Sequence, residues 1–154
     1  MTIYLVRHAK AGDRASWSGS DAQRPLSKAG WKQAHRLGKR LASSGATALV
    51  SSPYVRCVQT LEPLAEHVRL PIGIDDRLTE GAAFEGALAL LDEAADGVVL
   101  CSHGDVIPET IDALVRRGLD LRTPPDWRKA SVWLLHRNKH GVITRAAVWS
   151  PPGA

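Results

Sequence analysis

The sequence contains 154 residues, of which 44% are hydrophobic and 23% are charged, and its 20 Lys and Arg against 16 Asp and Glu give a formal net charge of +4. This composition is typical of a globular protein rather than a disordered chain, and the length predicts a single domain over residues 1–154. Two cysteines, Cys57 and Cys101, are too few for a disulfide framework and lack the CxxC spacing of a zinc site. We therefore expect no metal, no membrane-spanning segment and a reducing, cytoplasmic setting.

Hydrophobic periodicity predicts strands that alternate with helices along the chain. The first half is predicted to form a strand over 3–6, a loop over 11–25, a helix from an N-cap at Ser27 to about Ala42, a strand over 46–50 and a helix from Pro53 to Val68. A strand over 71–74, a loop over 75–81, a helix over 84–94, a strand over 98–101 and a helix from after Gly104 to about Val115 follow. The last predicted elements are strands over 130–136 and 142–149 joined by a hairpin turn. This order predicts an α/β fold of three layers, α/β/α, with a mainly parallel central sheet and at least one antiparallel strand.

Chemically distinctive residues follow three of the predicted strands. Arg7 and His8 end the first strand, Arg56 follows the second by a few residues, and His103 follows the strand over 98–101. Because the carboxyl ends of parallel strands meet at one edge of a sheet, we expect these side chains to lie together there. The sequence has neither a GxSxG serine elbow nor a GxxxxGK[ST] phosphate loop, so neither of those chemistries is indicated.

Two arginines with two histidines suit a phosphoryl group. The planar guanidinium donates paired hydrogen bonds to phosphate oxygens, a neutral imidazole can attack phosphorus, and a second imidazole can donate to the transferring oxygens. Taken singly, His8, His103 and Arg56 would more often be structural or solvated, and for Arg7 a surface ion pair and a functional role are equally expected. Their common position at the strand ends favours a phosphate-binding site, with phosphoryl transfer as one possible activity.

Four segments carry a family resemblance over nearly the whole chain. They are Leu5–Ala9, Arg24–Gly30, Ser51–Thr60 and Val99–Gly104. In this order they resemble the histidine phosphatase superfamily, which includes the phosphoglycerate mutases, and in particular its small phosphohistidine phosphatase branch. Ala9 departs from the usual glycine, a change that most backbone conformations tolerate. The resemblance implies that His8 is the nucleophile, that Arg7, Arg56 and His103 bind the phosphate, and that no metal or other cofactor takes part.

The proton donor is less distinct in the sequence. The segment Arg77–Glu80 resembles one in the mutase branch, which makes Glu80 the candidate general acid, with Glu85 and Asp105 as alternatives. A general acid and an ordinary solvated loop residue are equally good interpretations of Glu80. The loop over 11–25 should border the site, and its Arg14, Trp17 and Arg24 are candidate substrate contacts beyond the phosphate.

The sequence thus predicts a phosphatase that acts on phosphomonoesters or phosphohistidine through a phosphorylated His8. Its partner would be a phosphorylated small molecule, a nucleotide or a phosphohistidine protein. Two alternatives stay open: a non-catalytic or weakly catalytic phosphate-binding regulatory module, and a phosphoglycerate mutase-like phosphotransferase. Nucleic-acid binding is not indicated, because the basic residues are spread along the chain without a recognisable binding module.

Overall fold

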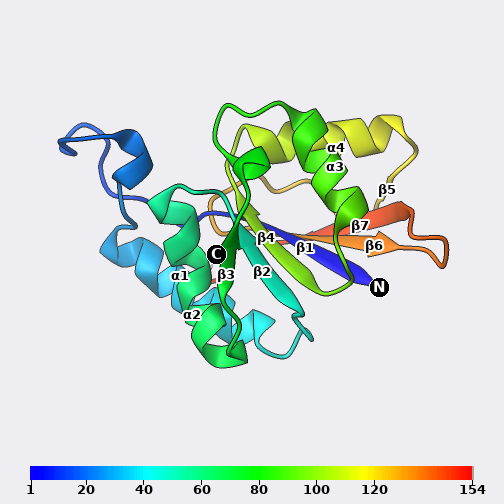
Figure 1. The fold of residues 1–154 in the computed structure, drawn as a ribbon, viewed down its shortest axis with the longest axis horizontal. Coiled ribbons are helices and arrows are strands. Elements are labelled where there is room, and N and C mark those ends of the chain that lie inside the picture. The colour runs from blue at the N-terminus through cyan, green and yellow to red at the C-terminus, as the bar shows by residue number, and fades with distance from the viewer. Residues whose placement is uncertain (154) are drawn as a thin grey trace.

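The computed structural model describes residues 1–153 and consists of one sheet with helices on both faces (Figure 1). The strands are β1 (Thr2–Arg7), β2 (Ala48–Ser51), β3 (Ile72–Ile74), β4 (Val98–Ser102), β5 (Asp120–Leu121), β6 (Val132–Arg137) and β7 (Ile143–Trp149). The α-helices are α1 (Lys28–Leu41), α2 (Val55–Val68), α3 (Phe84–Glu93) and α4 (Val106–Arg116), and short 3₁₀ turns cover Asp21–Gln23 and Asp76–Leu78. Within residues 1–153, none of the helices has both the length and the apolar character needed to cross a membrane.

The strand order across the sheet is β3-β2-β4-β1-β6-β7-β5. The four strands from β3 to β1 are mutually parallel, β6 runs antiparallel to both β1 and β7, and β5 pairs in parallel with β7. The predicted α/β fold class, mainly parallel with at least one antiparallel strand, is confirmed.

Alternation along the strands divides the core between the two faces of the sheet. In β1, Ile3 and Leu5 belong to the cluster that packs beneath α3 and α4, whereas Tyr4 and Val6 belong to the cluster beneath α1 and α2. Successive side chains of a strand point to opposite faces, so a continuous apolar run can fill two cores at once. The two helix pairs therefore form the outer layers, as Figure 1 shows.

The structure corrects several predicted boundaries. The second helix begins at Val55 rather than at Pro53, because Tyr54 is still extended. The strand predicted from residue 130 begins at Val132, because Ala130 has a left-handed backbone with φ of 68° and cannot continue a strand. The two-residue strand β5 was not predicted, since so short a segment carries no periodicity of its own.

Candidate active site

The predicted site residues meet at the carboxyl edge of the sheet. β2, β4 and β1 are neighbours, and Arg7 is in register with Ser102 at the ends of β1 and β4. The His8 backbone N–H donates to the Ser102 carbonyl at 3.1 Å, which continues the pairing by one residue. A cavity of about 320 Å³ opens there, lined by Arg7, His8, Ala11, Arg14, Arg24, Arg56, Glu80, Gly104, Asp105 and Lys129.

The buried His8 ring is held in one tautomer. Its Nδ1 lies 2.8 Å from the Ala9 carbonyl oxygen, and a carbonyl can only accept, so Nδ1 carries the proton. Burial is the main cause that lowers the pKa of His8 to about 3; the hydrogen bond to Ala9 opposes it, and the neighbouring His103 and the charges of Arg56 and Arg7 reinforce it. At neutral pH, Nε2 therefore presents an unprotonated lone pair.

Arg7 is fixed from two sides. Its Nη1 donates to the Trp127 carbonyl at 2.6 Å. On the other side its guanidinium lies against Gly104, where a Cβ would come within 2.5 Å of the Arg7 Cζ atom. Gly104, directly after His103, thus leaves the space that the guanidinium occupies.

Arg56 is almost completely buried, with 1% of its surface exposed. Its Nη2 donates to Asp21 Oδ2 at 3.0 Å and to Glu80 Oε1 at 3.2 Å, and its Nη1 donates to the Asp21 carbonyl at 2.9 Å. The guanidinium also lies 4.8 Å from the centre of the Tyr54 ring. A buried charge needs such partners to offset its desolvation.

His103 Nε2 lies against two side chains. It is 2.8 Å from Ser52 Oγ, which also accepts from the Tyr54 backbone N–H at 3.3 Å, and 3.5 Å from Cys57 Sγ. In the tautomer in which Nε2 accepts from one of these groups, the ring proton sits on Nδ1. That Nδ1 lies 3.9 Å from Glu80 Oε1, on the side of the cavity lining.

Three buried nitrogen atoms in this cluster have no hydrogen-bond partner within residues 1–153. They are Arg7 Nε, Arg56 Nε and His103 Nδ1, and the three residues surround His8 closely enough to lower its pKa. Buried polar atoms in proteins are almost always paired, and a cluster of unpaired donors marks a place where an anion is stabilised. The site therefore combines an unprotonated imidazole nitrogen with donors suited to phosphate oxygens.

Asp21 is a site residue that the sequence analysis missed. Its carboxylate bonds to Arg56 and, at 3.0 Å, to Arg24 Nε, and it lies 3.8 Å from Arg14 Nε. These bonds with Arg24 and Arg56 lower the pKa of Asp21 against the effect of its partial burial. Its position three residues before Arg24 is the signal that would have drawn attention to it.

The three acid candidates differ in their placement. Glu80 lines the cavity and bonds to Arg56, as described above. Asp105 also lines the cavity, but its two oxygens accept from the backbone N–H groups of Gly81 and Val106. Glu85 is exposed in the first turn of α3 and lies outside the lining.

Of the three substrate contacts predicted in the loop over 11–25, two line the cavity and one does not. Arg24 is buried on the cavity wall and also donates to the Gly12 carbonyl at 2.6 Å, and Arg14 lines the cavity from an exposed position. Trp17 lies outside the lining, is 38% exposed and donates its indole N–H to the Ser20 carbonyl. Its contact with substrate stays a prediction. Lys129, which no sequence motif singled out, also lines the cavity.

Comparison with known proteins agrees with this geometry. The model of the histidine phosphatase superfamily, branch 1, matches residues 3–89. The chain belongs to this superfamily. The predicted family and fold are thereby confirmed.

Three similar proteins extend the comparison. An 8-oxo-(d)GTP phosphatase from Mycolicibacterium smegmatis is 37% identical over 157 residues, which cover 98% of this chain and 48% of that protein. The chain thus spans about half the length of this relative. The protein histidine phosphatase SixA in complex with tungstate superposes with a TM-score of 0.75 at 22% identity, over 97% of this chain and 95% of that one. A phosphohistidine phosphatase SixA structure from Nakamurella multipartitia gives 0.71 at 25% identity, over 99% and 96%.

Proposed function

We propose that the protein is a phosphatase that transfers a phosphoryl group from its substrate to His8 Nε2 and then to water. The observation that carries this proposal is the combination at His8: a ring whose only proton is committed to the Ala9 carbonyl, beside three buried nitrogen atoms without a hydrogen-bond partner, two of which are arginine donors. Its pKa of about 3 keeps the ring neutral, with Nε2 unprotonated, at any pH near neutral. A nucleophilic nitrogen and an anion site are the two requirements of the reaction.

In the first step, Nε2 of His8 forms a bond to phosphorus as the bond from phosphorus to the leaving oxygen or nitrogen breaks. The electron pair of that bond stays on the leaving group, which takes a proton where its basicity requires one. In the second step, water adds to phosphorus, the bond from phosphorus to Nε2 breaks, and inorganic phosphate leaves with the proton released to it or to solvent. Atoms and charge balance as the hydrolysis of one phosphate group.

The surrounding residues have distinct roles in this scheme. Arg7, Arg56 and the Nδ1 proton of His103 stabilise the charge on the transferring oxygens, the largest contribution expected in phosphoryl transfer. Glu80, 3.2 Å from Arg56 and on the cavity wall, is the group best placed to deliver the proton to an alkoxide leaving group. Because the arginines supply the positive charge, the scheme requires no metal.

Phosphomonoesters of small molecules or nucleotides and phosphohistidine on proteins are the substrate classes that this site would accept. The name of the Mycolicibacterium smegmatis relative, 8-oxo-(d)GTP phosphatase, supports a nucleotide, and that of the protein histidine phosphatase SixA supports a phosphohistidine protein. The two buried, unpaired cysteines, Cys57 and Cys101, are consistent with a cytoplasmic location, which we include in the proposal.

Replacement of His8 tests the mechanism. In His8→Ala, hydrolysis of p-nitrophenyl phosphate should fall by roughly a thousandfold or more. The matched control is His35→Ala, which removes an exposed histidine from α1 and should retain the wild-type rate. Wild-type protein quenched in base after reaction with ³²P-labelled substrate should carry label on His8.

Retained hydrolysis in His8→Ala would overturn the mechanism. Tight binding of inorganic phosphate to wild-type protein without any turnover would instead support the alternative of a phosphate-binding regulatory module.

A further inference from the structure

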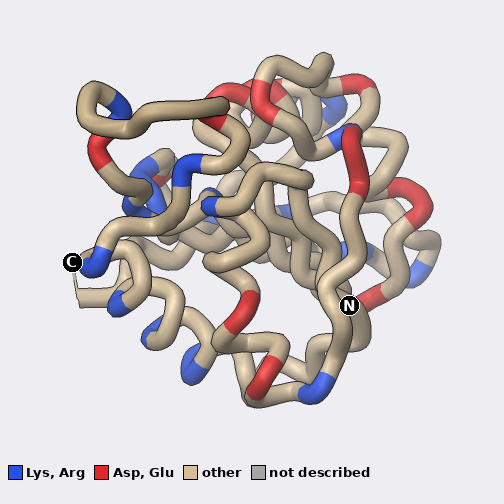
Figure 2. The backbone as a smooth tube through the Cα atoms, turned by 60° about the vertical axis from the view of Figure 1, so that its left-hand side comes forward, with Lys and Arg blue, Asp and Glu red and all other residues tan. Residues whose placement is uncertain are grey.

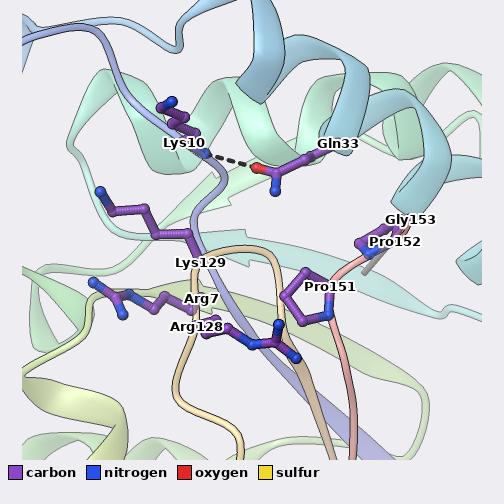
Figure 3. Close-up of a pocket in the computed structure, with 8 residues that line it drawn as sticks. All are labelled: Arg7, Lys10, Gln33, Arg128, Lys129, Pro151, Pro152 and Gly153. Carbon is purple, nitrogen blue, oxygen red and sulfur yellow. Dashed lines mark hydrogen bonds between the residues drawn. The ribbon is translucent and has the colours of Figure 1, made fainter.

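A second cavity, of about 470 Å³, adjoins the catalytic one. It shares two of its lining residues, Arg7 and Lys129, with the catalytic cavity, so these two side chains border both cavities. Pockets that hold small molecules commonly measure about 300–1,000 Å³. Its complete lining, shown in Figure 3, is Arg7, Lys10, Gln33, Arg128, Lys129, Pro151, Pro152 and Gly153.

The cations of this cavity are not neutralised equally. Arg128 is held by Asp126, with bonds of 3.0 and 2.6 Å, and in Figure 3 its side chain extends towards Pro151, away from Arg7 and Lys129. Among residues 1–153, Lys10 and Lys129 form no ion pair. Lys10 and Lys129 are therefore the two charges available to an anion beside the catalytic site.

The backbone fixes both lysines next to the catalytic strand. The Ala130 N–H donates to the carbonyls of Arg7 and His8, at 3.1 and 3.2 Å, so Lys129 is held directly beside the end of β1. The Lys10 N–H donates to Gln33 Oε1 at 2.9 Å, and its carbonyl accepts from the Ser27 N–H at 3.0 Å. Neither position depends on a flexible loop tip.

The charges concentrate around Lys129. Partial desolvation, together with the positive charges of Arg7, Arg24, Lys10 and Arg56, lowers the pKa of Lys129. Figure 2 shows that most Lys and Arg positions lie on the side of the molecule that bears the C-terminus, while Asp and Glu predominate elsewhere. Such an accumulation of like charge is unfavourable in the free protein and is relieved when an anion binds.

We propose that this second cavity is a subsite for a second phosphate group of the substrate, held by Lys10 and Lys129. This proposal rests on the proposed function and specifies its substrate class: small molecules with a phosphoanhydride, such as nucleoside diphosphates. In a phosphoanhydride the two phosphorus atoms share one bridging oxygen, so a terminal phosphate at His8 places the second one beside the shared wall of Arg7 and Lys129. Pro152, which is half-buried and lines the cavity, offers an apolar surface to the organic part.

The chemistry of such a substrate fits the site. Nε2 of His8 forms a bond to the terminal phosphorus as the bond from that phosphorus to the bridging oxygen breaks, and the nucleoside monophosphate leaves with the electron pair. Water then releases the terminal phosphate, so the net change is the hydrolysis of one anhydride bond. The leaving group is itself a stable phosphate anion and needs less help from an acid than an alkoxide does.

The test compares ADP with AMP as substrates. Lys10→Met and Lys129→Met each remove one charge with little change in side-chain volume. Each should lower the ratio of kcat/KM for ADP to kcat/KM for AMP by about tenfold, the effect of one lost hydrogen bond to a charged group. Lys139→Met, which removes an exposed lysine from the hairpin turn, is the control and should leave the ratio unchanged. An unchanged ratio, whether kcat/KM falls equally for both substrates or for neither, would overturn the subsite.

A binding measurement keeps this test separate from the proposed function. In a His8→Ala background, calorimetry should show that Lys10→Met and Lys129→Met weaken the binding of ADP more than that of AMP. This result would support the subsite even if turnover through His8 were disproved. The opposite outcome is also distinct. If hydrolysis of p-nitrophenyl phosphate depends on His8, but both lysine variants weaken the binding of ADP and of AMP equally, the phosphatase proposal stands and the subsite is rejected.

Discussion

At the scale of single residues, the placement of Arg7 depends on the absence of a side chain at position 104. A Cβ at Gly104 would lie 2.5 Å from Arg7 Cζ and 2.6 Å from Arg7 Nη2, so Gly104→Ala should push the guanidinium away from the cavity. Only the far end of a flexible side chain has to move, and the fold should be retained. We expect kcat/KM to fall by about ten- to a hundredfold, measured with p-nitrophenyl phosphate beside a thermal melt.

A double-mutant cycle with Arg7→Ala checks the cause of that loss. If the substitution at Gly104 acts by displacing Arg7, it should add little further loss once the Arg7 side chain has been removed. Multiplicative losses in the double variant would show that Gly104 acts by some other route.

Individual residues also mark the limit of what the sequence could predict at the site. His8, Arg7, Arg56 and His103 were predicted to meet because each lies at or just beyond a strand end, a position that periodicity reveals. Lys129 was not predicted, because its place depends on hydrogen bonds from Ala130 to carbonyls more than 120 residues earlier in the chain. Nothing in the local sequence around residue 129 encodes that contact.

At the scale of secondary-structure elements, the start of α1 is closely packed on the segment that follows β1. Ser27 caps the helix by accepting from the Gly30 N–H at 3.1 Å, and its own hydroxyl donates to the Lys10 carbonyl at 3.1 Å. A Cβ at Gly30 would overlap that same carbonyl oxygen, which belongs to the backbone and cannot swing aside. The helix and the Lys10 segment approach this closely only because residue 30 is glycine.

Gly30→Ala should therefore destabilise the protein although alanine is the better helix former. We expect a loss of about 1–3 kcal/mol in the free energy of unfolding, the usual cost of overpacking, measured by urea denaturation. Gly73→Ala, whose Cβ would meet the Leu49 carbonyl at an ordinary 3.6 Å, is the matched control and should change stability less. A Gly30→Ala protein as stable as wild type would show that α1 can shift without cost.

The elements themselves were largely predictable for a physical reason. Strands buried on two faces are continuous apolar runs, and amphipathic helices repeat with a different period, so both kinds of element are visible in the sequence. The predicted cap at Ser27 and the predicted turn over 138–141 are confirmed, because each is a local arrangement of a few residues. The start of β6 was wrong because tertiary hydrogen bonds hold Ala130 in a left-handed conformation.

At the scale of the whole molecule, the stability of the fold offsets the unfavourable burial of several positively charged and titratable groups at the site. The two hydrophobic clusters, one on each face of the sheet, supply the stability that offsets the burial of Arg56, His8 and His103 at the sheet edge. Sites that bring unfavourable groups together for function lower the stability of the protein that contains them. The pH dependence of unfolding should reveal this cost.

His8 has a pKa of about 3 in the folded protein and an ordinary value of 6.5 in the unfolded chain. As pH falls below 6.5, the unfolded chain therefore binds a proton that the folded protein does not, and stability is lost with a slope of up to about 1.4 kcal/mol per pH unit. His8→Gln removes this contribution. As the pH falls from 6.5 to 5, the free energy of unfolding of the wild type should therefore decrease more than that of the variant. This window lies above the range in which carboxylates titrate, and His136, whose pKa is also lowered, contributes equally to both proteins. Urea denaturation at several pH values measures the difference, and parallel stability curves would contradict a neutral, buried His8.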